Sequence, residues 1–94
     1  MNFEQAQKEL RKGSKMARKG WNGKGMFIYL VDSSTVPVDK LRGNAAKHIN
    51  KAVIGDNDVC IHAHIDMKTS DGKILVGWNP SQFEMFAEDW VVVD

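Results

Sequence analysis

The stretch Met26-Phe27-Ile28-Tyr29-Leu30-Val31 decides the fold, because it contains no charged or strongly polar side chain. Alternate side chains of a strand point to opposite faces of a sheet, so such a run predicts a strand that is buried on both faces. We therefore expect it to form a central strand. Further strands are predicted at residues 15–18, 36–38, 59–67, 73–78 and 89–93.

Helix signals occur at three places along the chain. Asn2 can cap an N-terminal helix, and Gln5 is placed to complete a capping box. Asp39 can cap a second helix, while Asn79 as the cap and Pro80 as the first helical residue can start a third. The helices are predicted over residues 3–12, 39–50 and 80–87. The pattern predicts an α+β fold with a mainly antiparallel sheet, an N-terminal helix and one or two short helices.

The length and composition indicate one small domain, and we expect the protein to lie in the cytoplasm. A chain of 94 residues has room for one hydrophobic core, so we expect residues 1–94 to form a single domain. Cys60 is the only cysteine, which excludes an intrachain disulfide and suits a reducing cytoplasm. No apolar run has the length of a membrane span, and the N-terminus lacks the apolar core of a signal peptide. We therefore expect no membrane partner.

The net charge of +1 conceals an uneven distribution of charge. Residues 1–25 hold seven cations against two acidic residues, whereas the rest of the chain holds six cations against ten acidic residues. Such asymmetry is typical either of an anionic partner or of a solvated, charged surface. The chain lacks a dense basic face and any known recognition motif, so we expect no nucleic-acid partner.

The segment Arg18–Phe27 has the composition of a ligand-binding loop. It contains three glycines, Trp21, an amide and three cations. Glycine lets the backbone approach a ligand closely, tryptophan offers a flat face, and the Lys24 ammonium can bind an anion. The glycine spacing fits neither a Walker A loop nor a dinucleotide fingerprint, and the segment leads into a strand rather than a helix. It predicts a ligand clamp of another kind.

A second polar group lies on the predicted strand 59–67. Strand alternation places Cys60, His62, His64 and Asp66 on one face. These are metal-ligand types, and they support an alternative function: a metal-dependent phosphodiesterase or nucleotide hydrolase that uses His62, His64 and Asp66. One strand cannot supply four converging ligands, so a half-solvated polar face is the other interpretation, and we expect no metal.

A third group of interest lies between the predicted strand 73–78 and the third predicted helix. Helix N-termini present free N–H groups that suit phosphates, so Ser81 or Gln82 could contact one. Trp78 is either a core residue or, together with Trp21, one of two aromatic faces that sandwich a nucleobase or another flat group. The cations of the segment Arg18–Phe27 would then bind the attached phosphates.

Several separated motifs follow one another along nearly the whole chain: Lys19–Met26, His64–Lys68, Asp71-Gly72, Gly77-Trp78 and Ala87–Trp90. In this combination they resemble a small phage and prophage family that includes the second type of Thoeris anti-defence protein. The segments Val59–Ala63 and Asn79–Glu84 are more individual to this sequence. They leave open which ligands are accepted.

The resemblance implies a binding protein with no catalytic residues and no cofactor. Proteins of that family bind the signalling nucleotide made by the TIR-domain enzyme of the Thoeris defence system, a glycocyclic isomer of ADP-ribose, and hold it away from its effector. The resemblance also implies a homo-oligomer, a tetramer, with ligand pockets between subunits. The place of action would be the cytoplasm of the bacterial host.

The pocket residues follow from the positions at which the motifs match. Their roles are assigned by chemistry: aromatic faces for the base, cations and amides for the phosphates, and a carboxylate for the ribose hydroxyls. The predicted ligand-binding set is Trp21 and Trp78 for stacking, Asn22, Gly23 and Lys24 for the polar and phosphate side, Met26 or Phe27 as an apolar wall, Asp66 for ribose, and Ser81 or Gln82 for a phosphate at the helix start.

Overall fold

The computed structural model describes all residues from 1 to 94, and its internal contacts divide the chain into two compact units. The first unit combines Met1–Val31 with His64–Asp94, and the second unit is the intervening segment Asp32–Ala63. None of the helices is both long enough and apolar enough to cross a membrane.

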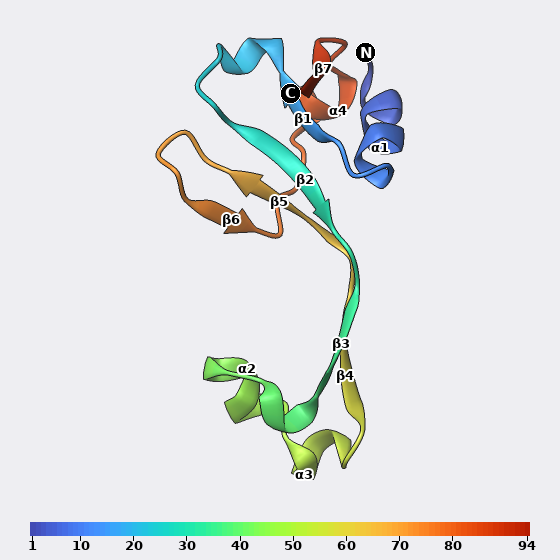
Figure 1. Ribbon diagram of the computed structural model, residues 1–94, viewed down its shortest axis with the longest axis vertical. Helices are drawn as coiled ribbons and strands as arrows, with labels where there is room; N and C mark the ends of the chain where they lie inside the picture. The colour runs from blue at the N-terminus through green and yellow to red at the C-terminus, as the bar shows by residue number, and fades with distance from the viewer. The chain divides into compact units, whose positions relative to one another are not determined.

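A five-stranded antiparallel sheet forms the centre of the first unit (Figure 1). Its order is β6-β5-β2-β1-β7, so β2 occupies the middle, as the apolar run predicted. The strands are β1 (Lys15–Arg18), β2 (Phe27–Val31), β5 (His64–Lys68), β6 (Ile74–Val76) and β7 (Trp90–Val93). The predicted α+β fold with a mainly antiparallel sheet is confirmed.

The register of this sheet pairs the buried side chains of neighbouring strands with one another. Met16 of β1 pairs with Ile28 of β2 and with Val92 of β7, and Ile28 pairs with Met67 of β5. Met16 and Ile28 are fully buried at 0% exposure. Because β1 lies between β2 and β7, the loop that follows β1 emerges beside the start of β7.

The N-terminal helix α1 (Phe3–Arg11) lies beside β1 and β7 (Figure 1). The predicted capping box is present: the Gln5 backbone N–H donates to the Asn2 side chain at 2.9 Å, and the Asn2 N–H donates to the Gln5 side chain at 2.8 Å. Two orphan N–H groups are thereby satisfied. The buried face of α1 is formed by Phe3, Ala6 and Leu10, the face expected from helical spacing.

The last helix, α4 (Gln82–Phe86), begins later than the sequence predicted. Ser81 is the N-cap, so the expectation of Asn79 as cap and Pro80 as first helical residue is wrong. The reason is a second capping box, in which the Glu84 N–H donates to Ser81 Oγ at 3.3 Å and the Ser81 N–H donates to the Glu84 carboxylate at 3.0 Å. A reciprocal pair of bonds outweighs the preference of proline for the first helical position.

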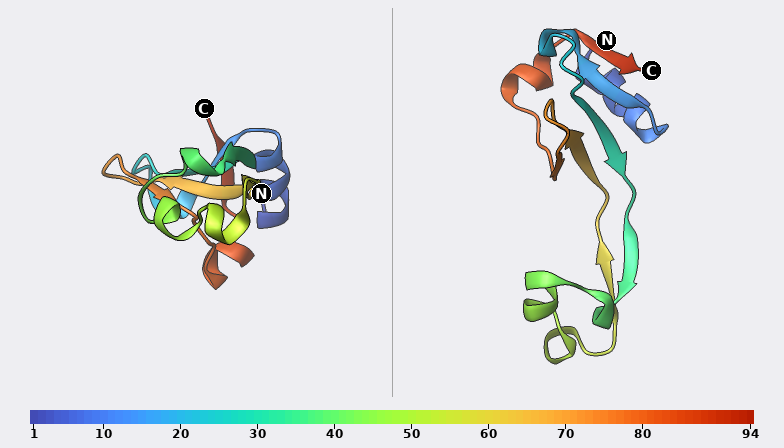
Figure 2. Two further views of the ribbon diagram at one scale, coloured as in Figure 1. Left: turned by 90° about the horizontal axis from the view of Figure 1, so that it is seen from below. Right: turned by 60° about the vertical axis from the view of Figure 1, so that its left-hand side comes forward.

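The second unit is built on a two-stranded antiparallel sheet of β3 (Ser34–Pro37) and β4 (Asp58–Ile61). Figure 2 shows the helical segment that connects these strands. It consists of a 3-10 turn η2 (Val38–Lys40) and the short helices α2 (Gly43–His48) and α3 (Lys51–Ile54). Val38 is the buried apolar residue of this unit.

The single helix predicted over residues 39–50 is wrong. After η2 the backbone is extended at Leu41 and Arg42, and α2 starts only at Gly43, whose φ is +61°. A left-handed glycine breaks a helical path and restarts it in another direction. A further extended residue, Asn50, separates α2 from α3 and caps α3 by accepting from the Ala52 N–H at 3.0 Å.

The continuous strand predicted over residues 59–67 is also wrong. The ladder of β4 ends at Ile61, and β5 begins at His64 in the other sheet. His62 and Ala63 belong to neither strand. The alternation that was expected to place Cys60, His62, His64 and Asp66 on one face is therefore interrupted, because strand periodicity holds only within one regular ladder.

Candidate ligand-binding site

The glycine-rich loop after β1 folds into a tight turn. It begins with a 3-10 turn, η1 (Lys19–Trp21), closed by a hydrogen bond of 3.0 Å from the Asn22 N–H to the Lys19 carbonyl. Asn22 then adopts a left-handed conformation with φ +58°, and Gly23 and Gly25 follow at φ +64° and +74°. Asparagine and glycine are the residues that tolerate this region of backbone space. The turn therefore requires the residue types that the sequence provides.

Trp21 joins this loop to the core of the first unit. Its ring meets Trp90 edge to face at a centroid distance of 5.4 Å and an angle of 79°, and it meets Trp78 at 6.3 Å and 81°. Trp90 is fully buried and Trp78 is 9% exposed, so both belong to the hydrophobic core. The three indoles therefore form one cluster, the tryptophan cluster, at the base of the loop.

Trp21 and Trp78 of the same chain do not lie on opposite sides of a flat group. Two rings that hold a base between them must be nearly parallel and separated by the thickness of that base. Here the two planes are at 81° and the rings touch edge to face. Trp78 takes the core role that the sequence left open, and Trp21 alone lies at the surface of the cluster.

A hollow of about 620 Å³ opens beside the loop, within the first unit. Small-molecule sites commonly have volumes of about 300–1,000 Å³. The hollow is lined by residues of the loop, of the end of β1 and of the edge strand β7. Its lining residues are Ala17, Arg18, Lys19, Trp21, Asn22, Gly23, Lys24, Gly25, Met26 and Val91–Val93. Five of the predicted binding residues thus come together: Trp21, Asn22, Gly23, Lys24 and Met26.

The cations that line this hollow differ in whether an acidic side chain already pairs with them. Arg18 is neutralised by Asp89, with Nε 2.8 Å from the carboxylate Oδ1. Lys19 and Lys24 are exposed, and the ion pairs of the chain are formed by other residues. The expected use of Arg18 for phosphate binding is therefore weakened, whereas Lys19 and Lys24 carry free ammonium groups at the rim.

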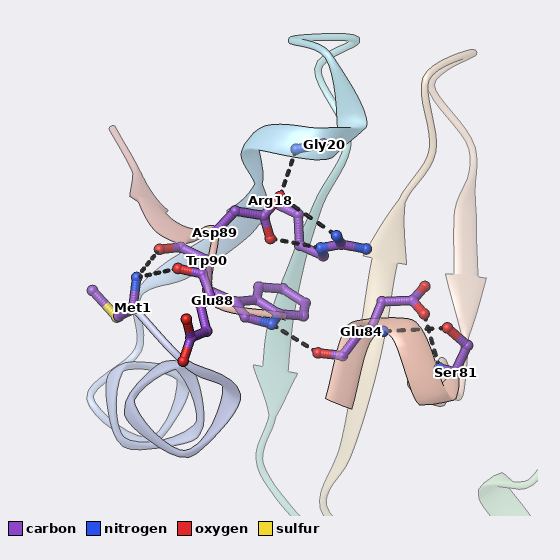
Figure 3. Close-up of polar contacts among 8 residues, drawn as sticks. All are labelled: Met1, Arg18, Gly20, Ser81, Glu84, Glu88, Asp89 and Trp90. Carbon is purple, nitrogen blue, oxygen red and sulfur yellow. Dashed lines mark hydrogen bonds and ion pairs between the residues drawn. The ribbon is translucent and has the colours of Figure 1, made fainter. Parts of the chain in front are cut away.

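Asp89 is the residue of this site that sequence reasoning missed. Its Oδ1 accepts from Arg18 Nε and its Oδ2 accepts from the Gly20 backbone N–H, each at 2.8 Å (Figure 3). Its backbone carbonyl also accepts from the Lys19 N–H at 3.0 Å. The Arg18 guanidinium, helped by the Gly20 N–H, holds the pKa of the Asp89 carboxyl below its ordinary value.

The motif Ala87–Trp90 contained Asp89, but the partners of Asp89 lie about 70 residues away in the sequence and could not be inferred from the motif.

The start of β7, next to Asp89, is fixed from two further directions (Figure 3). The α-ammonium group of Met1 donates to the carbonyls of Glu88 at 3.2 Å and Trp90 at 2.8 Å. The Trp90 indole N–H donates to the Glu84 carbonyl in α4 at 2.9 Å. Asp89 is consequently held on a rigid piece of backbone.

The other predicted binding residues lie outside the hollow. Phe27 lies under two lysines, with Lys15 Nζ 4.9 Å and Lys68 Nζ 6.0 Å from its ring centroid. Ser81 uses its hydroxyl to cap α4, and the Glu84 carboxylate at the same helix start opposes the binding of a phosphate there. Gln82 is exposed on the first turn of α4.

Asp66 has a structural position in the sheet. It is 7% exposed, and its Oδ1 accepts from the Gly77 N–H at 3.1 Å and lies 3.4 Å from His64 Nε2. No group of three or more histidine, cysteine or acidic side chains lies close enough together to hold a metal ion. Cys60, an exposed free thiol on β4, is not part of such a group.

The fold and the hollow define the class: a small α+β protein in which a glycine-rich loop packs on a core of tryptophans. Comparison with known proteins then gives the family. Residues 1–93 match the Thoeris anti-defense 2-like domain, Tad2-like. The chain is also 39% identical over 93 residues to the protein named Thoeris anti-defense 2 of Bacillus phage SP01, covering 99% of this chain and 94% of that protein. The chain belongs to the Thoeris anti-defense 2-like family, and the resemblance noted from the sequence is confirmed.

Proposed function

We propose that this chain is an anti-defence protein that binds and sequesters a signalling nucleotide without cleaving it. The nucleotide is a glycocyclic isomer of ADP-ribose made by a TIR-domain enzyme, and its removal in the cytoplasm of the bacterial host leaves the Thoeris effector inactive. The family and the name of the phage relative support Thoeris as the target. The observation that carries the binding role is the hollow beside Trp21.

The base of the nucleotide stacks on Trp21 in this proposal. Trp21 lines the hollow and is only partly buried, so part of its ring is open to a ligand. Its contacts with Trp78 and Trp90 fix the orientation of the ring before a ligand arrives. A fixed aromatic ring loses little conformational entropy on binding, which favours affinity. Met26 supplies an apolar wall on the same side of the hollow.

The phosphates meet the rim of the hollow. Lys24 and Lys19 supply unpaired ammonium groups, and Asn22 and Gly23 supply an amide and an accessible stretch of backbone. Positive charge and N–H donors together bind phosphate better than either alone, because charge-assisted hydrogen bonds are about twice as strong as neutral ones. These residues account for the polar side of the predicted pocket.

The chemistry of the lining supports sequestration rather than cleavage. The hollow is lined by apolar residues, glycines, an amide and cations, and none of its lining residues is a carboxylate, histidine, cysteine or serine. General acid–base and nucleophilic catalysis most often use such a group within hydrogen-bond reach of the reacting atom, and the exposed lysines of this lining, Lys19 and Lys24, have no carboxylate or histidine in the lining to act with them. The hollow therefore suits a binding protein, which returns its ligand unchanged.

The finer part of the proposal is a homo-oligomer, a tetramer as the resemblance implies. Phe83 and Phe86, three residues apart on α4, are 84% and 76% exposed. The edge strand β6 presents three further exposed apolar side chains, with Ile74 and Val76 at 61% and 67%. Apolar surface on an unpaired strand edge and on one helix face supports contact with further copies of the chain.

The oligomer also gives a place to the predicted residues that lie outside the hollow. In the proposed arrangement, Phe27, Ser81 and Gln82 reach a ligand from a neighbouring subunit. Trp78 and Asp66 support the site from within the fold, because both are at least nine-tenths buried.

Recovery of the ligand tests this function. The protein is mixed with a glycocyclic ADP-ribose isomer, the free ligand is removed by filtration, and the retained protein is denatured by heat. We expect the released molecule to have its original mass and to activate the Thoeris effector. Recovery of a cleaved product would instead support the hydrolase alternative that uses His62, His64 and Asp66, and a filtrate that contains all of the ligand would contradict binding.

A further inference from the structure

We infer that Asp89 is a positioning residue for ligand binding: it clamps the turn that carries Trp21 and so sets the shape of the hollow. This inference rests on the proposed function, because it assigns a role at the same site. Asp89 itself does not line the hollow. It acts through Gly20, which directly precedes Trp21 in the chain, and through Arg18, which lines the hollow.

The geometry shows a two-sided clamp (Figure 3). One carboxylate oxygen accepts from Arg18 Nε, and the other accepts from the Gly20 N–H, each at 2.8 Å. Arg18 is the last residue of β1 and Gly20 is the middle residue of η1. The carboxylate therefore fixes the point at which the chain leaves the sheet, one residue before Trp21.

The position of Gly20 has a steric requirement that agrees with this role. A methyl group added at Gly20 would lie 3.1 Å from Asp89 Oδ2 and 3.4 Å from a terminal nitrogen of Arg18. Gly20 does not have a positive φ, so its backbone conformation alone does not demand glycine. An added Cβ would instead require the Asp89 carboxylate to move by a few tenths of an ångström, because 3.1 Å is closer than most contacts of a Cβ atom.

The charged surroundings keep the clamp in its ionised form. Asp89 faces the Arg18 guanidinium on β1, and the ammonium group of Met1 binds the carbonyls of the residues on either side of it, Glu88 and Trp90. The Glu88 side chain is exposed and makes no hydrogen bond or ion pair through its carboxylate. Glu88 thus offers a matched control: the same kind of charge, one residue away, without the clamp.

The test compares Asp89→Asn with Glu88→Gln. Asparagine has the shape of aspartate but has an NH₂ group, which only donates, in place of one oxygen, so it cannot accept on both sides of the clamp, where Arg18 Nε and the Gly20 N–H each meet a different oxygen. Calorimetry with a glycocyclic ADP-ribose isomer gives both the affinity and the active fraction of each variant. We expect Asp89→Asn to bind at least about tenfold more weakly with an unchanged active fraction. Glu88→Gln should bind like the original chain.

Affinity and active fraction, taken together, distinguish a positioning role of Asp89 from a merely structural one. A residue that only stabilises the fold lowers the fraction of competent protein and leaves the affinity of the folded protein unchanged. A positioning residue changes the affinity itself, because the competent arrangement of the loop becomes a minor one. Equal affinities for Asp89→Asn and the original chain would overturn the inference while leaving the proposed function intact.

Amide hydrogen exchange provides a readout that needs no ligand. In Asp89→Asn we expect the Gly20 amide to exchange at least about tenfold faster, and the acceleration should be larger there than in the core strands β2 and β5, which exchange by global unfolding. Unchanged exchange at Gly20 would overturn the inference. Should Asp89→Asn fail to fold, Gly20→Ala disturbs the same contact from the other side and should weaken binding in the same direction. Absence of binding by the original chain would contradict the proposed function as well.

Discussion

The indole of Trp21 meets the indole of Trp90 edge to face, with ring centroids 5.4 Å apart and planes at 79°. Trp90 is fully buried, and Trp21 lies at the edge of the hollow. This contact connects the most buried aromatic side chain of the chain with the one that lines the hollow. The loop that carries Trp21 is therefore anchored to the core, and its ring orientation is set by the fold.

We expect Trp21→Ala to lower the affinity for a glycocyclic ADP-ribose isomer by about ten- to a hundredfold. The reason is the loss of stacking, which contributes about 1–3 kcal/mol per base. Trp21→Phe keeps a flat face and should retain most of the affinity. Calorimetry on both variants measures the effect. If Trp21→Ala binds as well as the original chain, the assignment of the base to Trp21 is wrong.

Lys24→Gln should weaken binding by about tenfold, because it removes a charged partner of the phosphates. The remaining affinity should also depend less on salt, since one fewer charge takes part in binding. Lys8→Gln is the control, because Lys8 is an exposed cation of α1 that lies outside the hollow. Calorimetry at two ionic strengths measures both effects. An equal loss of affinity in the two variants would indicate a nonspecific effect of net charge.

The pKa of Asp89 predicts a pH dependence of stability with a definite sign. Because the folded-state pKa is lowered, the clamp stabilises the fold above the ordinary pKa of the unfolded carboxyl, and this contribution is lost as pH falls through the lower, folded-state pKa. The difference in unfolding free energy between the original chain and Asp89→Asn should be constant near neutral pH and shrink below about pH 4. Urea unfolding at a series of pH values measures it. A difference that grows on acidification would refute this sign, and Glu88→Gln should show a smaller difference throughout.

Trp90→Phe should lower the unfolding free energy by about 2 kcal/mol. The substitution removes buried ring atoms at a position that is 0% exposed, and it removes the donor that binds the Glu84 carbonyl at 2.9 Å. Trp21→Phe should cost less, because Trp21 is only partly buried. Urea unfolding followed by circular dichroism compares the two. Equal costs would mean that Trp90 is no more important to the core than Trp21.

Phe83→Ser combined with Phe86→Ser should convert the proposed oligomer into smaller species. The two rings are the most exposed large apolar side chains of the chain, and polar replacements remove the surface that further copies would cover. Light scattering after size exclusion gives the mass of each species. Val53→Ser, at a 63% exposed position in the second unit, is the control. An unchanged mass of the double variant would place the contact elsewhere.

Local signals in the sequence predicted most elements of the first unit, although they placed the start of α4 too early. The capping box of Asn2 and Gln5 and the apolar run of β2 each act over a few residues, and the structure contains both. The same reasoning failed where elements are interrupted. Gly43 and the break after Ile61 end regular structure at positions where apolar spacing alone suggested continuity.

Only part of the candidate site could be predicted, because sequence signals of this kind act over a few residues. Trp21 and Lys24 lie in one short segment whose composition indicates a ligand, and the structure brings that segment to one hollow. Asp89 and the edge-to-face contacts of the tryptophan cluster depend on pairings between distant parts of the chain. Such pairings follow from the order of strands in the sheet, which places β7 next to β1, and a single sequence does not state that order.

The central claim, that this chain holds a nucleotide in the hollow beside Trp21, is tested most directly by calorimetric titration of the unmodified protein with a glycocyclic ADP-ribose isomer. The account predicts saturable binding that survives in Glu88→Gln and is strongly weakened in Trp21→Ala. A titration of the unmodified protein that shows no saturable binding would contradict it.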